Sequence, residues 1–286
     1  MLVAGGPFPI AQFVVILLAG VALYWAGMIL NDVFDLEKDK AERAARPIPA
    51  GDIALGQAKF AGWGLLLVGV VLAFVAGHLP IDGIVSSNLP GFVAIALAIM
   101  IVLYDGPLKK TPLAPAAMGS CRILSFLMGA APVVAMKSAP YFPNHVLGIA
   151  IGFGIYIMGV TTMARREATG GSSKQLTVGL IVAAVGVALI AVAPKFVATS
   201  TSWQFNSDLH YPILIGLVFL PVVRRGLAAI QDPVPKKIQN SIRTGILTLI
   251  PLCAVVALLG AGTLWGIVIL ALMAPTVFLA SRLRVT

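Results

Sequence analysis

Long apolar stretches separated by short polar connections make up most of this chain. Most of them reach or approach the roughly 20 residues that a helix needs to cross the hydrocarbon core of a membrane. Because backbone groups in lipid must find partners within the protein, stretches of this length are predicted to be helices. The nine stretches lie at about residues 8–30, 53–78, 91–104, 114–136, 143–164, 175–194, 210–223, 243–260 and 262–281. The pattern therefore predicts an all-α, polytopic transmembrane bundle of about nine helices.

Composition supports the same class of protein. Hydrophobic residues make up 59% of the chain and charged residues only 11%, whereas a soluble domain has roughly 25% charged residues. Cys121 and Cys253 both fall within predicted helices, so they do not indicate a disulfide framework. No basic segment precedes the first apolar stretch, and we expect no cleavable signal peptide. Residues 1–286 are expected to form a single transmembrane domain.

The distribution of basic residues predicts the orientation in the membrane. The formal net charge is +9, but the Lys and Arg residues gather in alternate connections, and the opposite face has only Lys137 and Lys195. This asymmetry is the positive-inside signature, so we expect a cell inner-membrane protein whose first connection is cytoplasmic. We therefore expect the positive charge to set the orientation in the membrane and to bind phosphate, rather than to bind nucleic acid. The basic residues of the predicted cytoplasmic face are Lys38, Lys40, Arg43, Arg46, Lys109, Lys110, Arg165, Arg166, Lys174, Arg224, Arg225, Lys236, Lys237, Arg243, Arg282 and Arg284.

The most informative segment follows the first apolar stretch and runs from Asn31 to Asp39, with the sequence NDVFDLEKD. Asp32, Asp35 and Asp39 are spaced by three and then four residues, which places them in one stripe on a helix. Clustered carboxylates need a cation between them, and hard oxygen ligands select Mg²⁺, which usually completes its shell with substrate phosphate oxygens. The segment therefore predicts a metal–diphosphate site at the membrane surface.

Two arginines follow this acidic segment closely. Arg43 and Arg46 lie within reach of the same region, and an Arg side chain can grip a phosphate through two parallel hydrogen bonds. The alternative is that they only balance the acidic residues and contribute to the topology signal. Because Pro47 constrains the backbone beside Arg46, we favour phosphate binding for that residue.

The next cytoplasmic connection offers a second group of polar side chains. Gly106 begins a turn that directs Tyr104 and Asp105 toward the membrane edge and Lys109 along the loop. A lysine beside a metal–diphosphate would neutralise charge on the leaving group, and Lys110 follows it. The alternative is a Tyr and Lys pair at the membrane interface, which is common in membrane proteins.

Two further basic groups have equally open interpretations. Arg122 lies inside a predicted helix and needs a partner or a cavity, so either a salt bridge, for example to Asp105, or substrate binding would explain it. Arg165, Arg166 and Glu167 follow the fifth apolar stretch. They indicate either a second phosphate or metal contact, or a plain basic cytoplasmic loop.

The pattern Asn31-Asp32-x-x-Asp35-x-x-x-Asp39 resembles the first Asp-rich motif of the UbiA superfamily of intramembrane prenyltransferases. The Arg46-Pro47-Ile48 segment with Gly51, and the Tyr104…Leu108-Lys109 segment, also fit that family, and the helix layout fits over nearly the whole chain. The resemblance implies a helical bundle around a central cavity, with Mg²⁺ holding an isoprenyl diphosphate between two Asp-rich loops. Such enzymes ionise the allylic diphosphate, and an aromatic or other lipophilic acceptor captures the carbocation.

The resemblance also implies roles for individual residues in isoprenoid biosynthesis at a membrane. Expected catalytic residues are Asp32, Asp35 and Lys109, and expected metal ligands are Asp32, Asp35, Asp39 and Glu167. Expected diphosphate-binding residues are Asn31, Arg43, Arg46, Lys109, Lys110, Arg165 and Arg166. Expected acceptor or cavity residues are Tyr104, Asp105 and Arg122. The expected partners are a prenyl diphosphate, a lipophilic acceptor and membrane lipid, without nucleic acid.

The chain departs from the family pattern in two places. The second Asp-rich motif is replaced by a segment with no aspartate, so either Glu167 helps to hold a second ion, or one metal remains and Arg165 or Arg166 contacts the diphosphate. The family usually has two helices before the first motif, and here one precedes it. Either the first helix is absent, or the true start of the protein lies upstream.

Two other functions compete with prenyl transfer. The missing second motif favours a prenyl-lipid-binding membrane protein of the same fold with weak or no catalysis. A transporter would also have charged residues among its helices. Transport is disfavoured because six of the eleven acidic residues lie between Asp32 and Asp52.

Overall fold

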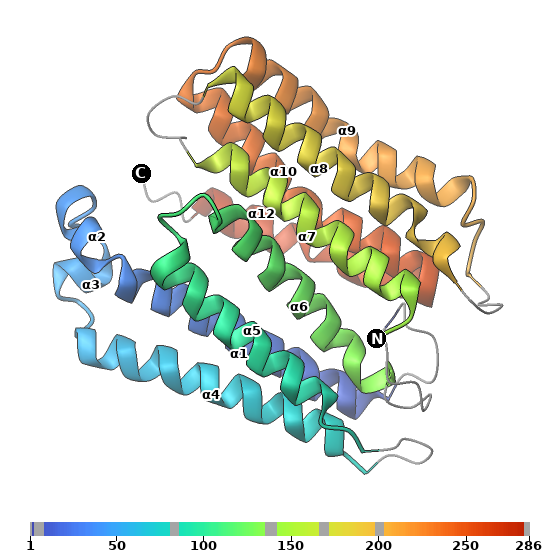
Figure 1. Ribbon diagram of the computed structural model, residues 1–286, viewed down its shortest axis with the longest axis horizontal. Coiled ribbons are helices and arrows are strands. Elements are labelled where there is room, and N and C mark those ends of the chain that lie inside the picture. The colour runs from blue at the N-terminus through green and yellow to red at the C-terminus, as the bar shows by residue number, and fades with distance from the viewer. Residues whose placement is uncertain are drawn as a thin grey trace. The chain divides into compact units, whose positions relative to one another are not determined.

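The computed structural model describes residue 2 and residues 9–80, 86–134, 142–165, 172–197 and 203–282. These residues form helices joined by turns and contain no strand (Figure 1), which confirms the predicted all-α class. Eight helices in this part of the chain are long and apolar enough to cross a membrane, as expected of an integral multi-pass membrane protein. The chain divides into two compact units, built on Gly6–Phe142 and Pro143–Thr286.

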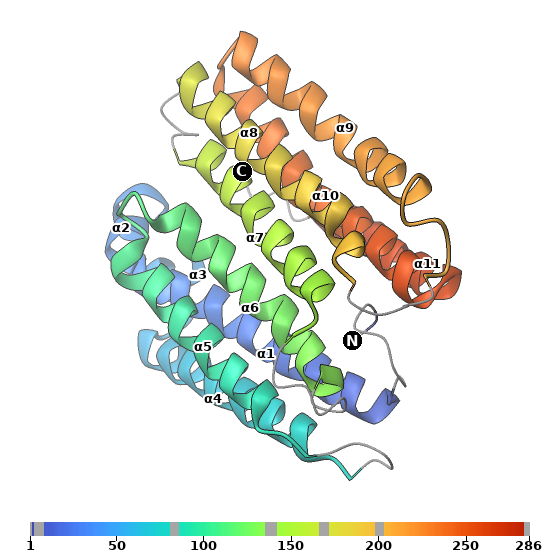
Figure 2. The same ribbon diagram turned by 45° about the vertical axis from the view of Figure 1, so that its right-hand side comes forward.

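The first unit contains four of the long helices. Two short helices occupy the connection between the first two of them, and a π-helical turn, η1, ends the third (Figure 2). In chain order its elements are α1 (Ile10–Phe34), α2 (Leu36–Glu42), α3 (Pro47–Ala50), α4 (Leu55–His78), α5 (Leu89–Leu103), η1 (Tyr104–Leu108) and α6 (Ala114–Val134).

Close packing of α1 against α4 fixes the end of α1, where the acidic segment begins. A Cβ atom added to Gly69 would lie 2.6 Å from Leu23 Cγ, and one added to Gly62 would lie 2.9 Å from Leu30 Cδ2. Small residues let helix backbones approach closely in membranes, where hydrophobic burial does not drive association. Since Leu30 is fully buried against α4, the residues that follow it start from a fixed position.

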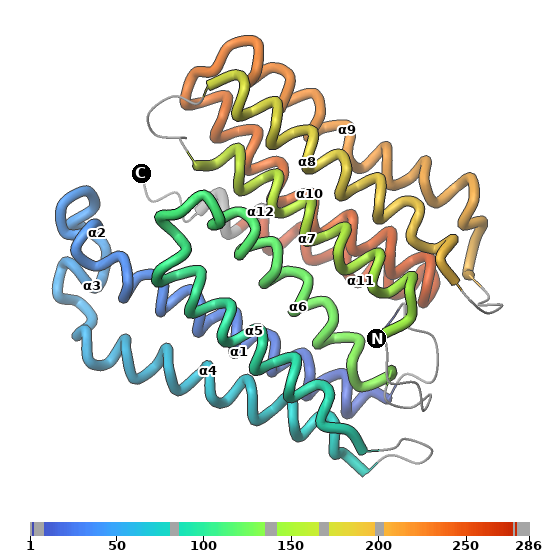
Figure 3. Tube along the Cα trace, viewed as in Figure 1, coloured from blue at the N-terminus to red at the C-terminus, as the bar shows by residue number. Residues whose placement is uncertain are grey.

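The second unit also contains four long helices, followed by two short ones (Figure 3). Glycines line the contact between its first two helices, where a Cβ atom on Gly159 would lie 2.4 Å from Ala183 N. The Tyr156 hydroxyl donates a 2.6 Å hydrogen bond to Gly245 O, which joins α7 to α10. In chain order its elements are α7 (Asn144–Ala164), α8 (Ser173–Val192), η3 (Ala193–Phe196), α9 (His210–Gln231), α10 (Pro235–Ala261), α11 (Thr263–Ala271) and α12 (Met273–Arg282).

The helices differ from the predicted stretches mainly at their ends. The stretch at 91–104 continues through η1 and the stretch at 210–223 extends to Gln231, so both short predictions are long helices. The stretch at 262–281 is divided into two shorter helices at Leu272 instead of forming one span. The described residues therefore contain eight long helices and a divided ninth segment.

Candidate functional site

The acidic segment keeps its helical spacing although one helix ends within it. α1 ends at Phe34 and α2 begins at Leu36, but Asp35 N–H donates to Asn31 O at 3.0 Å. Asp39 N–H donates to Asp35 O at 2.8 Å, so the hydrogen-bond ladder continues across the junction. The three aspartates consequently remain about one helical turn apart.

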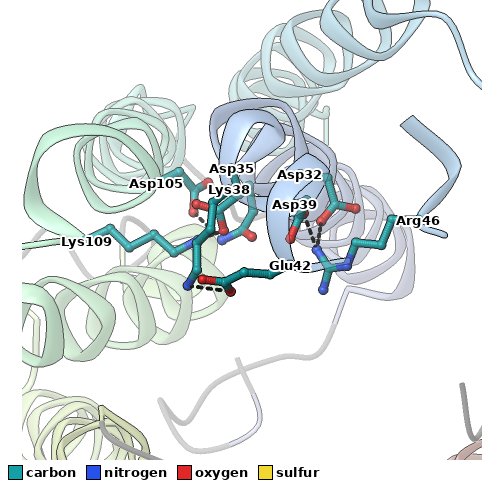
Figure 4. A network of polar contacts seen from close by, with 9 residues as sticks. Asp32, Asp35, Lys38, Asp39, Glu42, Arg46, Asp105 and Lys109 are labelled. Atoms are coloured by element: carbon teal, nitrogen blue, oxygen red, sulfur yellow. Dashed lines mark hydrogen bonds and ion pairs between the residues drawn. The ribbon is translucent and has the colours of Figure 1, made fainter. Parts of the chain in front are cut away.

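Two of these aspartates converge on one arginine. Arg46 Nη1 donates to Asp32 Oδ1 at 2.9 Å and to Asp39 Oδ2 at 2.7 Å (Figure 4). The Asp39 side chain is only 5% exposed, whereas the Asp32 side chain is about half exposed. Arg46 is the residue immediately before α3, and Pro47 occupies the first helical position. The turn into α3 thus returns the guanidinium to the end of α1.

The third aspartate is directed to a different cation. Lys109 Nζ donates to Asp35 Oδ2, and the two side chains are 26% and 18% exposed. Asn31 Nδ2 donates to Asp105 Oδ1 at 3.0 Å in the same region. In Figure 4, Asp35, Asp105 and Lys109 lie to one side of the helix, and Asp32 and Arg46 lie to the other.

A pocket of about 260 Å³ opens beside Arg46 and its two carboxylate partners. One end is charged, with two carboxylates around one guanidinium, and the remaining wall is mostly apolar. Its lining comes from α1, α2, α4 and the α3 segment, and comprises Ile29, Asp32, Asp39, Arg46, Pro47, Ile48, Pro49, Ile53, Gln57, Ala58 and Ala61.

Carboxylates at the end of α1 are the groups that could hold Mg²⁺. Within the described part of the chain, no group of three or more His, Cys, Asp or Glu side chains is arranged to hold a metal ion. Asp32 and Asp39 nevertheless bring two carboxylate oxygens to the same Arg46 atom. Mg²⁺ is usually held by one or two carboxylates together with substrate phosphates and water. A carboxylate pair of this kind therefore fits Mg²⁺ bound with a diphosphate.

Other predicted site residues are more peripheral. Arg43 and Lys110 are exposed, and Tyr104 is partly buried. Arg122 is exposed and forms no ion pair with Asp105 or with any other residue that the structure describes. The suggested Arg122–Asp105 salt bridge is therefore wrong, since Asp105 is bound by Asn31.

Arg165 is exposed and directly follows α7. Arg166 and Glu167 lie outside the described residues.

Sequence reasoning missed the Asn31–Asp105 pair, because it assigned the two residues separately to the diphosphate and to the acceptor. The equal spacing of residues 31 and 35 and of residues 105 and 109 was the available signal.

Residues 1–135, which include the carboxylate clusters and both of their cations, match the UbiA prenyltransferase family. This first part of the chain is similar to the UbiA prenyltransferase family. Digeranylgeranylglyceryl phosphate synthase of Methanothermobacter thermautotrophicus is 29% identical over 276 residues, covering 87% of this chain and 86% of that protein. The predicted resemblance to this superfamily is thereby confirmed.

Shorter alignments find relatives with the same name, and one solved structure has a similar fold. The synthases of Methanococcoides burtonii and Methanosarcina barkeri are 36% and 34% identical over 37% and 44% of this chain. These two alignments span only 34% and 40% of the relatives' own length. A solved structure from a study of digeranylgeranylglyceryl phosphate synthase in membranes superposes with a TM-score of 0.58 at 18% identity. It covers 92% of this chain and 88% of the other, and so supports the fold.

Proposed function

We propose that this protein is a Mg²⁺-dependent intramembrane prenyltransferase of the UbiA type. It would transfer an isoprenyl group from a prenyl diphosphate to a lipophilic acceptor. The observation that supports this most directly is the convergence of Asp32 and Asp39 on Arg46, beside Asp35 paired with Lys109. We further propose that residues 1–286 act as one functional domain and that the acidic connection faces the cytoplasm.

The carboxylates and the cations have complementary roles in binding the diphosphate. Asp32 and Asp39 would hold Mg²⁺, which when bound neutralises the diphosphate oxygens. Arg46 would then exchange its carboxylate partners for phosphate oxygens, which a guanidinium can bind through two hydrogen bonds. Asp35 pairs with Lys109 at the edge of the same segment, and Lys109 would donate to the diphosphate. Arg43 and Lys110, both exposed, would add longer-range attraction.

Ionisation is the step that these cations would accelerate. The bond between the allylic carbon and the diphosphate oxygen breaks, and the electron pair leaves with the diphosphate. Fixed positive groups stabilise the charge that develops on the leaving group, so we assign this role to Lys109 and Arg46. The apolar surroundings of the bundle would protect the carbocation from water. Asp32 and Asp35 are expected to be essential because they organise the cations.

The names of the relatives indicate the class of acceptor. Because they are digeranylgeranylglyceryl phosphate synthases, we propose an alcohol on an isoprenylglyceryl phosphate lipid as the acceptor. Its hydroxyl oxygen would form the new carbon–oxygen bond and lose its proton to the released diphosphate. Tyr104 and Arg122 are proposed acceptor-side contacts, and Arg165, Arg166 and Glu167 are proposed additional contacts to the diphosphate or a second metal.

The decisive experiment is binding and turnover of geranylgeranyl diphosphate by the purified protein, with Mg²⁺ and with EDTA. Mg²⁺-dependent binding and pyrophosphate release that rises with geranylgeranylglyceryl phosphate, but not with an aromatic acceptor, would support the whole proposal. Binding without release under any condition would favour a prenyl-lipid-binding protein, which the altered second motif would explain. Absence of Mg²⁺-dependent binding would overturn the proposed function.

A further inference from the structure

Two contacts with the same spacing join the end of α1 to the π-helical turn η1 and the lysine that follows it. Asn31 pairs with Asp105, and Asp35 pairs with Lys109, so each contact spans 74 residues of sequence. The contacting residues are four apart on both segments. One helical turn of α1 therefore lies against one turn of the other segment, and the two pairs together fix the register between them.

The Asp105 side of this arrangement is unusual for a membrane helix. Asp105 is only 5% exposed, and its Oδ2 atom is buried with no hydrogen-bond partner among the described residues. A buried carboxylate oxygen without a partner is costly, and an apolar residue at this position would favour stability. The residue also lies in a π-helix that contains Pro107, and π-helical turns are frequent at functional sites. The hydrogen bond that it accepts from Asn31 gives the Asp105 side chain a role at this position.

The chemistry of the pair determines which atom of Asn31 faces the remainder of the site. A carboxylate only accepts hydrogen bonds, so the Asn31 amide must turn its Nδ2 toward Asp105. Its Oδ1 is then left as an acceptor on a residue one helical turn before Asp35. Asn31 would consequently present an oxygen, suited to a hard cation, rather than the N–H donor expected for a diphosphate-binding residue.

We propose that Asp105 is a positioning residue of the prenyl-transfer site: it fixes the orientation of the Asn31 amide and, with it, the register that sets Lys109 on Asp35. This inference rests on the proposed function. Asp105 acts through Asn31 and Lys109 and does not itself contact the diphosphate. The role differs from the acceptor-side contact expected for Asp105 from the sequence.

An exchange of the two side chains tests the orientation directly. Asn31→Asp alone would set two carboxylates against each other, and Asp105→Asn alone would leave an amide that can pair with either end of Asn31. The double variant Asn31→Asp/Asp105→Asn restores one hydrogen bond with the donor now on η1, and residue 31 still presents an oxygen. Asp208→Asn is the matched control, since Asp208 is 75% exposed in the second unit.

Three quantities are measured for each protein: the Mg²⁺ concentration for half-maximal binding of a non-ionising geranylgeranyl thiolodiphosphate, kcat for pyrophosphate release, and Tm. We expect Asn31→Asp, which sets two carboxylates against each other, to lose about 10- to 100-fold in Mg²⁺ affinity, as when the partner that orients a metal ligand is lost. Asp105→Asn should lose less Mg²⁺ affinity than Asn31→Asp. The double variant should recover most of the affinity that Asn31→Asp loses. Asp208→Asn should match the wild type.

The outcomes separate this inference from the proposed function. Recovery of Mg²⁺-dependent binding in the double variant supports the positioning role, because a general packing defect would lower Tm without following the exchange. If the wild type is active but the double variant is no better than Asn31→Asp, then Asp105 does not orient Asn31 and the inference is overturned. If the wild type shows neither binding nor release, then the proposed function itself fails, before any variant is compared.

Discussion

The polar end of α1 and the connection between α9 and α10 contain the same kinds of side chain but use them differently. At α1, Lys109 reaches Asp35 across 74 residues of sequence, and both side chains are mostly buried. Between α9 and α10, Lys237 reaches Asp232 at 2.8 Å, only five residues away, and both side chains are about half exposed. A contact over long sequence separation requires the fold to bring two helices together, whereas the local pair forms wherever the turn forms.

The difference indicates which charges serve chemistry and which serve topology. Exposed ion pairs contribute roughly 0–1 kcal/mol and are screened by salt. Partly buried pairs remain only where geometry and hydrogen bonding compensate for the loss of hydration. The basic residues around Lys237 therefore need no explanation beyond the proposed cytoplasmic orientation of their connection. The cations at α1 need a further reason, which the proposed diphosphate site provides.

The largest effect on pyrophosphate release is expected when the carboxylates at the end of α1 are removed. Asp32→Ala and Asp35→Ala should each abolish Mg²⁺-dependent pyrophosphate release, because one removes a proposed metal ligand and the other releases Lys109. Release is measured with geranylgeranyl diphosphate, while circular dichroism confirms that the helices remain. Asp232→Ala, in the α9–α10 connection, is the control and should retain wild-type release. Wild-type rates in both α1 variants would remove the distinction between the two regions.

A somewhat smaller effect is expected for the two lysines. Lys109→Met should lower kcat by about 10²- to 10³-fold, as does the loss of one donor to a developing negative charge in other enzymes. Lys237→Met should leave kcat within about twofold, since its pair is local and exposed. The comparison requires single-turnover rates at saturating Mg²⁺. Equal losses in the two variants would show that general electrostatic attraction, rather than placement, explains the role of Lys109.

The sequence predicts the fold of this protein better than it predicts helix ends. The length of the apolar stretches was sufficient to place the long helices, because the membrane core sets a minimum span. It could not show that α10 begins at Pro235, since Lys236 and Lys237 in its first turn lie outside the apolar pattern. Apolar length alone also did not reveal the division of the last segment at Leu272. The available signal was Pro275, which has no N–H to donate to the Ala271 carbonyl, where α11 ends.

The candidate site was predictable in its members but not in its pairing. The spacing of Asp32, Asp35 and Asp39 correctly predicted helical neighbours. It did not show that Asp35 would turn to Lys109 while the other two share Arg46. Partner choice depends on how α5 packs beside α1, and tertiary packing of this kind is not encoded in local periodicity.

Helix packing within each unit predicts how two glycine substitutions change the free energy of unfolding. Gly159→Ala should destabilise the protein by about 1–3 kcal/mol, as overpacking does, because the new Cβ would lie 2.4 Å from the Ala183 backbone nitrogen. Gly64→Ala, with no atom within 4 Å of its added Cβ, should be neutral or slightly stabilising. Thermal unfolding in detergent measures both. A Gly159→Ala protein as stable as the wild type would mean that α7 and α8 can separate at little cost.

The smallest effect is expected at the end of α7, which offers an arginine where the first unit offers aspartates. Arg165 is exposed, so Arg165→Ala should weaken binding of geranylgeranyl diphosphate only a few-fold, in keeping with about 1 kcal/mol for an exposed charge contact. The loss should shrink at high salt, where exposed charges are screened. Arg224→Ala, also exposed and basic, is the matched control and should not change the affinity. If both variants bind equally well at low salt, then Arg165 contributes to topology alone, and phosphate recognition is confined to the cations that the fold brings to the end of α1.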